Sequence, residues 1–260
     1  MIRLFQLLFS ASKRSDKPMT EKIKLSTGAL VQFAPTTGKG NWPAVLLVHG
    51  WGSSPFQGSY EEVSELLTAG GYHCLSLALR GHADADGDIS TVSRKDHAAD
   101  IEAAVEYLRA QSGVHKDHLA GVGVSYGAYM LASCMPILGM ELVALRAPAL
   151  YPNEGWEEPT TKAIGDPNLA AWRAVEHTSD ESHALVGMRQ FRGKLLVISS
   201  GKDEQMPPAV SDSYVHTAYM NDDITHHIIK DARHSLTAGT EREYITTLEK
   251  WFQKNYPDLD

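Results

Sequence analysis

The sequence predicts an α/β fold in which a mostly parallel sheet is covered by helices on both faces. Short apolar runs alternate with segments of helical periodicity, and 260 residues suit one large domain. Residues 22–26 and 29–33 flank a Thr-Gly pair and predict an N-terminal antiparallel hairpin. The six apolar runs that follow are residues 44–48, 73–79, 118–124, 141–147, 194–200 and 223–230.

The helices between these runs carry their own start signals. Ser59, followed three residues later by Glu62, matches a capping box and predicts the start of a helix. Thr240 and Glu243 match a second capping box before the last helix. Apolar residues at helical spacing predict a further helix between the second and third runs, with one face formed by Ile101, Val105 and Leu108.

The N-terminus divides into an extension, residues 1–20, and a folded domain, residues 21–260. A short apolar run at residues 4–9 is followed at once by basic residues, and it is shorter than the roughly 7 to 15 residues of an export signal. We therefore expect a disordered extension on a cytoplasmic protein, with export as the alternative. A second interpretation is that Met19 begins the functional protein.

The longest gap between apolar runs, residues 150–193, is interpreted as a small lid. Asp166-Pro167 predicts a helix start there, and the gap is long enough for two short helices. The alternative is an ordinary crossover with a long loop. Trp156 and Trp172 within it are candidates for an aromatic wall over the site, although local packing also accounts for lid aromatics.

Composition limits the partners of the protein. The net charge of −8 disfavours nucleic acid and anionic membranes, which attract basic surfaces. The acidic loop at residues 84–88 fails as a calcium loop because Lys95 occupies the twelfth position, where a bidentate Glu is required. No phosphate-binding or dinucleotide motif is present. We expect a small-molecule substrate, no metal and no cofactor, and the sequence is compatible with a homodimer.

The motif Gly123-Val124-Ser125-Tyr126-Gly127 has the pattern G-x-S-x-G. It ends a predicted buried strand and opens a predicted helix, expected to stop at Pro136. In that setting a tight turn lifts the serine hydroxyl clear of the sheet, and the glycines leave room for the crowded backbone. Ser125 is therefore the candidate nucleophile, and the alternative is a glycine-rich helix entry with an inert serine.

From about Val45 to the last helix, the chain resembles the α/β-hydrolase family. Besides the serine motif, the first run ends in His49-Gly50-Trp51-Gly52, which is similar to the family's H-G-x segment. The resemblance implies an oxyanion hole formed by the backbone N–H groups of Trp51 and Tyr126. The stretch at residues 80–85 departs from the family pattern at Ala83, where a glycine is usual.

The resemblance also places the acid and the base of a triad. In the family the acid follows the next-to-last strand and the histidine follows the last one, which implies Asp203 and His234. Glu204 is the competing carboxylate. His234 is singled out by its position after the last run, because the chain has twelve histidines.

Together these observations predict a serine hydrolase that cleaves a carboxylic ester of a small molecule through an acyl-enzyme intermediate. Thioesterases, peptidases and C–C bond hydrolases of the family use the same triad and remain alternatives. A non-catalytic receptor on the same scaffold is a further alternative. The candidate substrate contacts are Phe56, Trp156 and Trp172.

Overall fold

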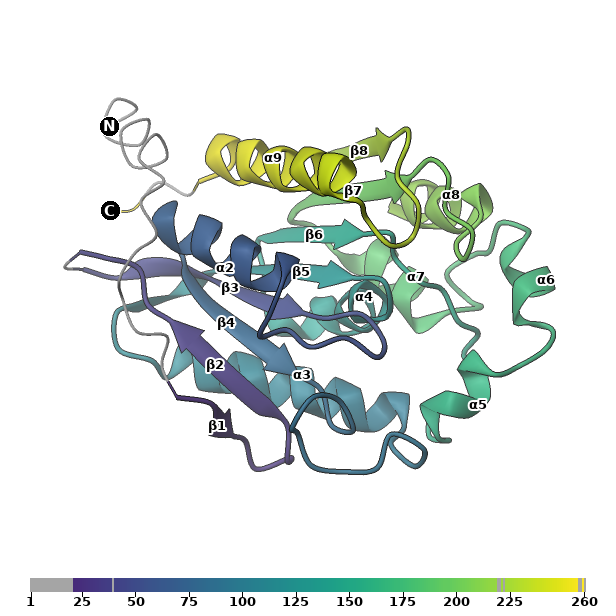
Figure 1. Cartoon of the computed structure of the whole chain (residues 1–260), viewed down its shortest axis with the longest axis horizontal. Helices are drawn as coiled ribbons and strands as arrows, with labels where there is room; N and C mark the ends of the chain where they lie inside the picture. The colour runs from purple at the N-terminus through teal and green to yellow at the C-terminus, as the bar shows by residue number, and fades with distance from the viewer. Residues whose placement is uncertain (1–20, 39, 219–220, 222, 257–258, 260) are drawn as a thin grey trace.

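An eight-stranded sheet organises the computed structural model, which describes residues 21–38, 40–218, 221, 223–256 and 259 (Figure 1). The extension predicted at residues 1–20 lies outside the described residues. The strand order is β1-β2-β4-β3-β5-β6-β7-β8. The strands are β1 (Ile23–Lys24), β2 (Leu30–Ala34), β3 (Trp42–Val48), β4 (His73–Ala78), β5 (Val114–Val124), β6 (Leu142–Arg146), β7 (Lys194–Ser200) and β8 (Ile224–Ile229).

Six of these strands are parallel, and the first two form the predicted hairpin. β1 pairs antiparallel with β2, and β2 pairs antiparallel with β4, whereas β3 to β8 are joined by parallel pairings. β3 lies between β4 and β5, so the chain reverses its direction of travel across the sheet there. In open α/β sheets such a reversal creates a crevice outside the carboxyl ends of the strands.

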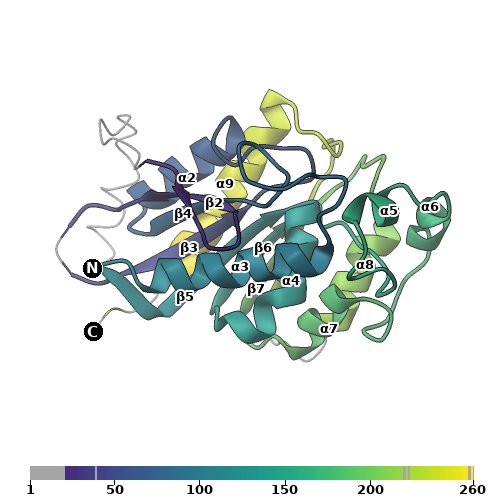
Figure 2. The same ribbon diagram turned by 90° about the horizontal axis from the view of Figure 1, so that it is seen from below.

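Helices cover both faces of the sheet, as Figures 1 and 2 show. On one face α2 (Ser59–Ala69) and α9 (Ala238–Lys254) pack over a cluster that includes Leu47, Leu67 and Trp251. On the other face lie α3 (Arg94–Arg109), α4 (Tyr126–Leu138), α7 (His183–Gln190) and α8 (Pro208–Thr217). This arrangement confirms the predicted fold class. The central strands are buried over most of their length, and such strands need helices on both faces of the sheet.

The predicted helix caps differ from those observed. Ser59 is the first helical residue of α2, and the N-cap is Gly58, which makes no side-chain cap bond. The capping box of α9 joins Thr237 and Thr240, so the predicted pair of Thr240 and Glu243 is wrong. Thr240 Oγ1 accepts the Thr237 N–H at 3.0 Å, and the helix therefore begins at Ala238, earlier than predicted.

The helix after Ser125 continues through Pro136 to Leu138, although the sequence predicts that it stops there. A proline inside a helix leaves the carbonyl four residues earlier without its usual donor, here that of Ala132. α7 packs against α4 at this point, and a Cβ added at Gly187 would collide with the Ala132 carbonyl. Tertiary packing against a glycine thus accommodates the irregular last turn.

The segment predicted as a lid contains three helices, where the sequence suggests two. α5 (Thr160–Ile164) and α6 (Leu169–Arg173) stand beyond the carboxyl ends of the strands, and α7 belongs to the helical layer (Figures 1 and 2). Asp166 caps the turn before α6 by accepting the Asn168 N–H at 2.8 Å. In the part of the chain that is described, no helix has both the length and the apolar character of a membrane span.

Candidate active site

Ser125 occupies a strained turn between β5 and α4. Its φ of 52° is positive, which is uncommon for a residue other than glycine. Its N–H donates to Arg146 O at 2.8 Å, and its carbonyl accepts the Ala149 N–H at 3.1 Å. A Cβ at Gly127 would collide with the carbonyls of Val48 and His49, so glycine is required where the turn meets β3. These contacts fix the direction of the serine side chain.

The structure brings Ser125, His234 and Asp203 together from the ends of three strands. Ser125 Oγ lies 2.9 Å from His234 Nε2, and His234 Nδ1 lies 2.9 Å from Asp203 Oδ2. The Asp203 side chain is only 3% exposed. Burial raises its pKa, but hydrogen bonds from His234 and from the Met206 and Gln205 N–H groups outweigh burial and hold the pKa below its usual value.

Glu204, the competing carboxylate, contacts the backbone of His234 and not its imidazole ring. Its Oε2 accepts the backbone N–H of His234 at 3.3 Å and faces Arg233 Nε at 3.4 Å. These bonds tie the loop after β7 to the loop after β8. Of the two carboxylates, only Asp203 is in hydrogen-bonding contact with the imidazole.

The loop of His49, Gly50 and Trp51 lies beside the serine. A Cβ at Gly50 would be 3.4 Å from Ser125 Cβ, and the Gly50 N–H donates to Tyr60 OH at 2.9 Å. The ring of Trp51 packs edge to face on that of Tyr126 at 5.2 Å. The backbone N–H of Tyr126 is at the first turn of α4, where the helix dipole favours negative charge. The sequence offers no signal for the contact between Tyr60 and Gly50.

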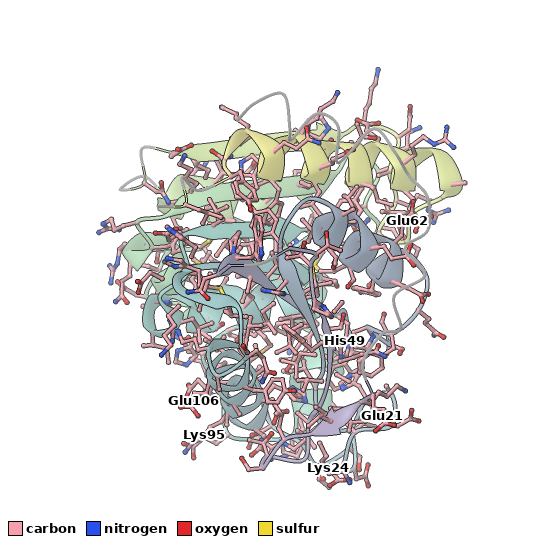
Figure 3. All side chains as sticks on the ribbon, turned by 90° about the vertical axis from the view of Figure 1, so that its left-hand side faces the viewer. Glu21, Lys24, His49, Glu62, Lys95 and Glu106 are labelled. Carbon is pink, nitrogen blue, oxygen red and sulfur yellow. The ribbon has the colours of Figure 1, made fainter. Side chains whose placement is uncertain are left out.

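Three buried histidines lie beneath this loop. His49 lies in the interior of the molecule, in contrast with Glu62 and Lys95 at its edge (Figure 3). Burial, together with the charge of His82, lowers the pKa of His49 to about 3. Burial likewise lowers the pKa of His97 to about 3 and lowers that of His82. All three imidazoles are therefore neutral at pH 7.

The hydrogen bonds of these histidines identify their tautomers. The Leu79 N–H donates to His49 Nε2 at 3.2 Å, so His49 Nδ1 carries the proton and donates to Gly50 O at 2.7 Å. His97 Nε2 donates to Arg80 O at 3.0 Å, which leaves Nδ1 to accept from Tyr126 OH at 2.6 Å. The neutral histidines thus support the two segments that flank Ser125.

A cavity of about 690 Å³ opens at Ser125 and His234. One side is formed by the segment after β6 together with α5 and α6, including Tyr151, Ile164 and Leu169. The cavity also extends toward the face of the sheet covered by α2 and α9. The residues that line this inner part are Leu47, Tyr60, Val63, Val122, Arg146 and Tyr244.

The three predicted substrate contacts lie away from the lining of this cavity. Phe56 packs under the Lys22 ammonium, 4.6 Å from the ring centroid. Trp156 packs on His183 with ring centroids 4.4 Å apart. Trp172 stacks on His177 at 3.7 Å. The structure therefore assigns local packing to all three aromatic side chains.

The sheet order and the serine turn at the carboxyl end of β5 define the class: the chain is an α/β hydrolase with a serine-hydrolase fold. Residues 29–184 match the family described as X-Pro dipeptidyl-peptidase (S15 family), and the chain belongs to this family. The matched segment includes Ser125, whereas Asp203 and His234 follow it. Among curated protein sequences, none matches the chain.

Solved structures with the same fold include esterases and a peptidase. Est1E from Butyrivibrio proteoclasticus, solved with ferulic acid, is 14% identical with a TM-score of 0.70, over 90% of this chain and 98% of that one. The Pyrococcus furiosus esterase Pf2001 is 16% identical with a TM-score of 0.71, over 92% and 91%. The Pyrococcus horikoshii acylaminoacyl peptidase is 17% identical with a TM-score of 0.73, over 98% of this chain and 44% of that chain. At these identities the similarity shows the fold alone.

Proposed function

We propose that the protein cleaves a carboxylic ester of a small molecule through an acyl-enzyme intermediate, with Ser125 as nucleophile, His234 as base and Asp203 as its orienting acid. The observation that carries the proposal is the distance of 2.9 Å from Ser125 Oγ to His234 Nε2. This separation is within the hydrogen-bond reach that a general base needs. The opposite ring nitrogen faces a carboxylate of depressed pKa, which favours the imidazolium form during the reaction.

In the proposed acylation step, Ser125 Oγ forms a bond to the ester carbonyl carbon while His234 Nε2 takes the hydroxyl proton. The carbonyl oxygen becomes an oxyanion, and the N–H groups of Trp51 and Tyr126 stabilise it. When the tetrahedral intermediate collapses, the C–O bond to the alcohol breaks and His234 returns the proton to the leaving oxygen. Water, activated by the same imidazole, then releases the acid and regenerates Ser125.

Peptide bond hydrolysis is the second candidate, and membership of the X-Pro dipeptidyl-peptidase family favours it. The similar fold of an acylaminoacyl peptidase is compatible with the same reaction. The same triad performs both chemistries, because an amide differs from an ester in the leaving group that His234 must protonate. The two candidates therefore differ in the substrate-binding cavity and not in the nucleophile.

A substrate panel separates the two candidates. Purified protein is given 4-nitrophenyl esters, matched thioesters, and dipeptide 4-nitroanilides with proline in the second position. The ester proposal expects kcat/KM for the best ester to exceed that of every anilide by more than the intrinsic reactivity difference measured in hydroxide. A preference for the X-Pro anilides would overturn it in favour of the peptidase.

A fluorophosphonate probe tests the mechanism independently of the substrate. The wild-type protein should be labelled at Ser125, because only a serine activated by a base reacts. Ser125→Ala should abolish labelling and lower kcat by several orders of magnitude, since triad members act as a unit. Ser133→Ala is the matched control, because Ser133 Oγ donates to Tyr129 O inside α4. Labelling that survives Ser125→Ala would contradict the assignment.

A further inference from the structure

We propose that the cavity selects a substrate that carries a carboxylate, and that Arg146 binds this carboxylate. The inference rests on the proposed function, because it names the substrate class of the same site. Arg146 is the last residue of β6 and is paired with Val124, the residue before Ser125. It lines the inner part of the cavity with Tyr60 and Tyr244. A cation thus lies one strand away from the nucleophile.

The guanidinium of Arg146 is buried but only partly hydrogen-bonded. The residue is 5% exposed. Nη2 donates to Ser200 Oγ at 3.1 Å and to Arg233 O at 3.2 Å. Among the described residues, Nε and Nη1 have no acceptor. An arginine presents five N–H donors in a planar fork, so the donors on Nε and Nη1 of this cavity-lining residue remain free for a ligand.

The same charge lacks a counter-ion of its own. No carboxylate of the described residues lies within ion-pair distance of Arg146. The carboxylate that acts on it electrostatically is Asp203, whose hydrogen bonds go to His234 and to two backbone N–H groups. Glu204, Asp166 and Glu241 also line the cavity without pairing with Arg146. Burial lowers the pKa of Arg146, as expected for a desolvated cation.

Two other arginines show what a structural guanidinium looks like in this protein. Buried Arg94 donates to Tyr129 OH and to the carbonyls of Pro152 and Glu154. Arg80 pairs with the buried Asp100 at 2.7 Å. Arg94 makes three hydrogen bonds through both terminal nitrogens, although its Nε has no partner, and Arg80 has a carboxylate partner, whereas Arg146 makes two bonds through Nη2 alone and pairs with no carboxylate of the described residues. A buried cation without an anionic partner is costly, and a bound carboxylate would satisfy the free donors of Arg146 with charge-assisted hydrogen bonds.

A second guanidinium lines the same cavity. Arg173, in α6, also lines it and is 8% exposed. Its Nε donates to Leu150 O at 2.9 Å and its guanidinium lies 4.5 Å from the centroid of the Tyr151 ring. Nη2 of this residue is buried without a hydrogen-bond partner among the described residues. Two arginines therefore line the cavity, together with the carboxylates of Asp166, Glu204 and Glu241.

Matched ester pairs test the inference. On the acyl side, mono-4-nitrophenyl adipate is compared with 4-nitrophenyl 6-methylheptanoate, whose isopropyl group has the shape of a carboxylate without its charge. On the leaving-group side, 4-acetoxybenzoate is compared with 4-isopropylphenyl acetate. The measured quantity is the ratio of kcat/KM for the anionic ester to that for the neutral ester. The wild-type protein should prefer the anionic ester in at least one pair by 10-fold or more.

Variants then assign the preference to Arg146. Arg146→Met should lower the ratio in the preferred pair by about 10- to 100-fold, the range expected for losing hydrogen bonds to a charged group. Arg146→Lys keeps the charge but not the fork, and should restore part of the ratio. Arg109→Met is the control, because Arg109 donates to Leu138 O away from the cavity, and it should leave the ratio unchanged.

The possible results have distinct meanings. Neutral esters turned over by a labelled Ser125, with no anionic preference in either pair, would overturn the inference while leaving the proposed function intact. A preference that Arg146→Met leaves unchanged would also overturn it, even if both rates fell together. If the Met variant fails to fold, Arg146→Lys makes the assignment, because its ratio should fall below that of the wild-type protein, and an unchanged ratio would overturn the inference. Absence of both turnover and Ser125 labelling would refute the proposed function, and the inference with it.

Discussion

Both carboxylate oxygens of Asp203 lie close to one ring nitrogen of His234, at 2.9 and 3.0 Å from Nδ1. This bidentate approach fixes the Nδ1–H tautomer and directs Nε2 toward the serine hydroxyl. Asp203→Asn replaces one oxygen by an amide that donates instead of accepting. We expect kcat for the best substrate to fall by ~10⁴-fold, with Ser125 still present and weakly reactive.

Glu204→Gln is the matched control for that change. Its carboxylate accepts the His234 N–H and faces Arg233 without touching the imidazole ring. We expect kcat to change by less than ~10-fold, because the backbone bond is long and the side chain is exposed. Steady-state kinetics on both variants checks the pair. If kcat fell more in Glu204→Gln than in Asp203→Asn, Glu204 and not Asp203 would be the acid that orients His234.

Gly127→Ala should damage the serine turn. An added Cβ collides with the carbonyls of Val48 and His49, so α4 would have to move away from β3. We expect the free energy of unfolding to fall by roughly 1 to 3 kcal/mol, the usual range for overpacked core positions. Urea unfolding followed by circular dichroism measures the change.

Gly239→Ala is the control for a glycine without such a contact. Nothing lies within 4 Å of a Cβ added at Gly239, which is in the first turn of α9. Alanine has the higher helix propensity, so this variant should be as stable as wild type or more stable by up to ~1 kcal/mol. If Gly127→Ala and Gly239→Ala destabilised the protein equally, the close contact of Gly127 with Val48 and His49 would not be the cause.

The buried histidines should make the fold sensitive to acid. The pKa values of His49 and His97 are about 3 in the folded protein and return toward 6.5 on unfolding. The unfolded chain therefore binds more protons below pH 6.5, so the stabilisation is fully present above pH 6.5 and is lost as the pH falls. Each histidine contributes a slope approaching ~1.4 kcal/mol per pH unit between 6.5 and 3.

Urea unfolding at half-unit steps from pH 7.5 to 5 measures this slope before most carboxylates titrate. His97→Asn loses the bonds to Tyr126 OH and Arg80 O and should be less stable at pH 7.5. The free energy of unfolding of this variant should nevertheless depend less steeply on pH than that of the wild-type protein. The difference should correspond to about one proton fewer taken up on unfolding. A variant with the wild-type slope would show that His97 is not one of the groups responsible.

The lid helices should control substrate preference through Leu169 and not through Trp172. Leu169 lines the cavity, whereas Trp172 stacks on His177 outside it. Leu169→Ala enlarges the cavity, so kcat/KM for long-chain esters relative to short ones should rise by roughly 10-fold. Trp172→Ala is the control and should keep the wild-type order of esters. A series of 4-nitrophenyl esters of increasing chain length measures both preferences. A changed preference in Trp172→Ala, with the wild-type preference kept in Leu169→Ala, would show that Trp172 contacts the substrate and Leu169 does not.

Chain order, together with the resemblance to the α/β-hydrolase family, locates much of the candidate site. Ser125, Asp203 and His234 each follow an apolar run, and parallel strands bring their carboxyl ends to one edge of a sheet. Apolar residues recur every second residue in a strand and about every 3.6 residues in a helix, so their spacing distinguishes the two without any knowledge of packing. For this reason the alternation of elements, the hairpin and the position of Ser125 at a strand-to-helix turn follow from the sequence.

Only the tertiary structure decides which side chains share a cavity and which buried groups have partners. Trp156 and Trp172 occupy the predicted segment, but their rings pack on neighbouring histidines, a choice that depends on how α5 and α6 turn. Arg146 ends a strand in the sequence like any charged residue, and its free donors become visible only when every nearby acceptor is known. Sequence periodicity reports which face of an element is buried, whereas hydrogen-bond satisfaction depends on distances between segments far apart in the chain.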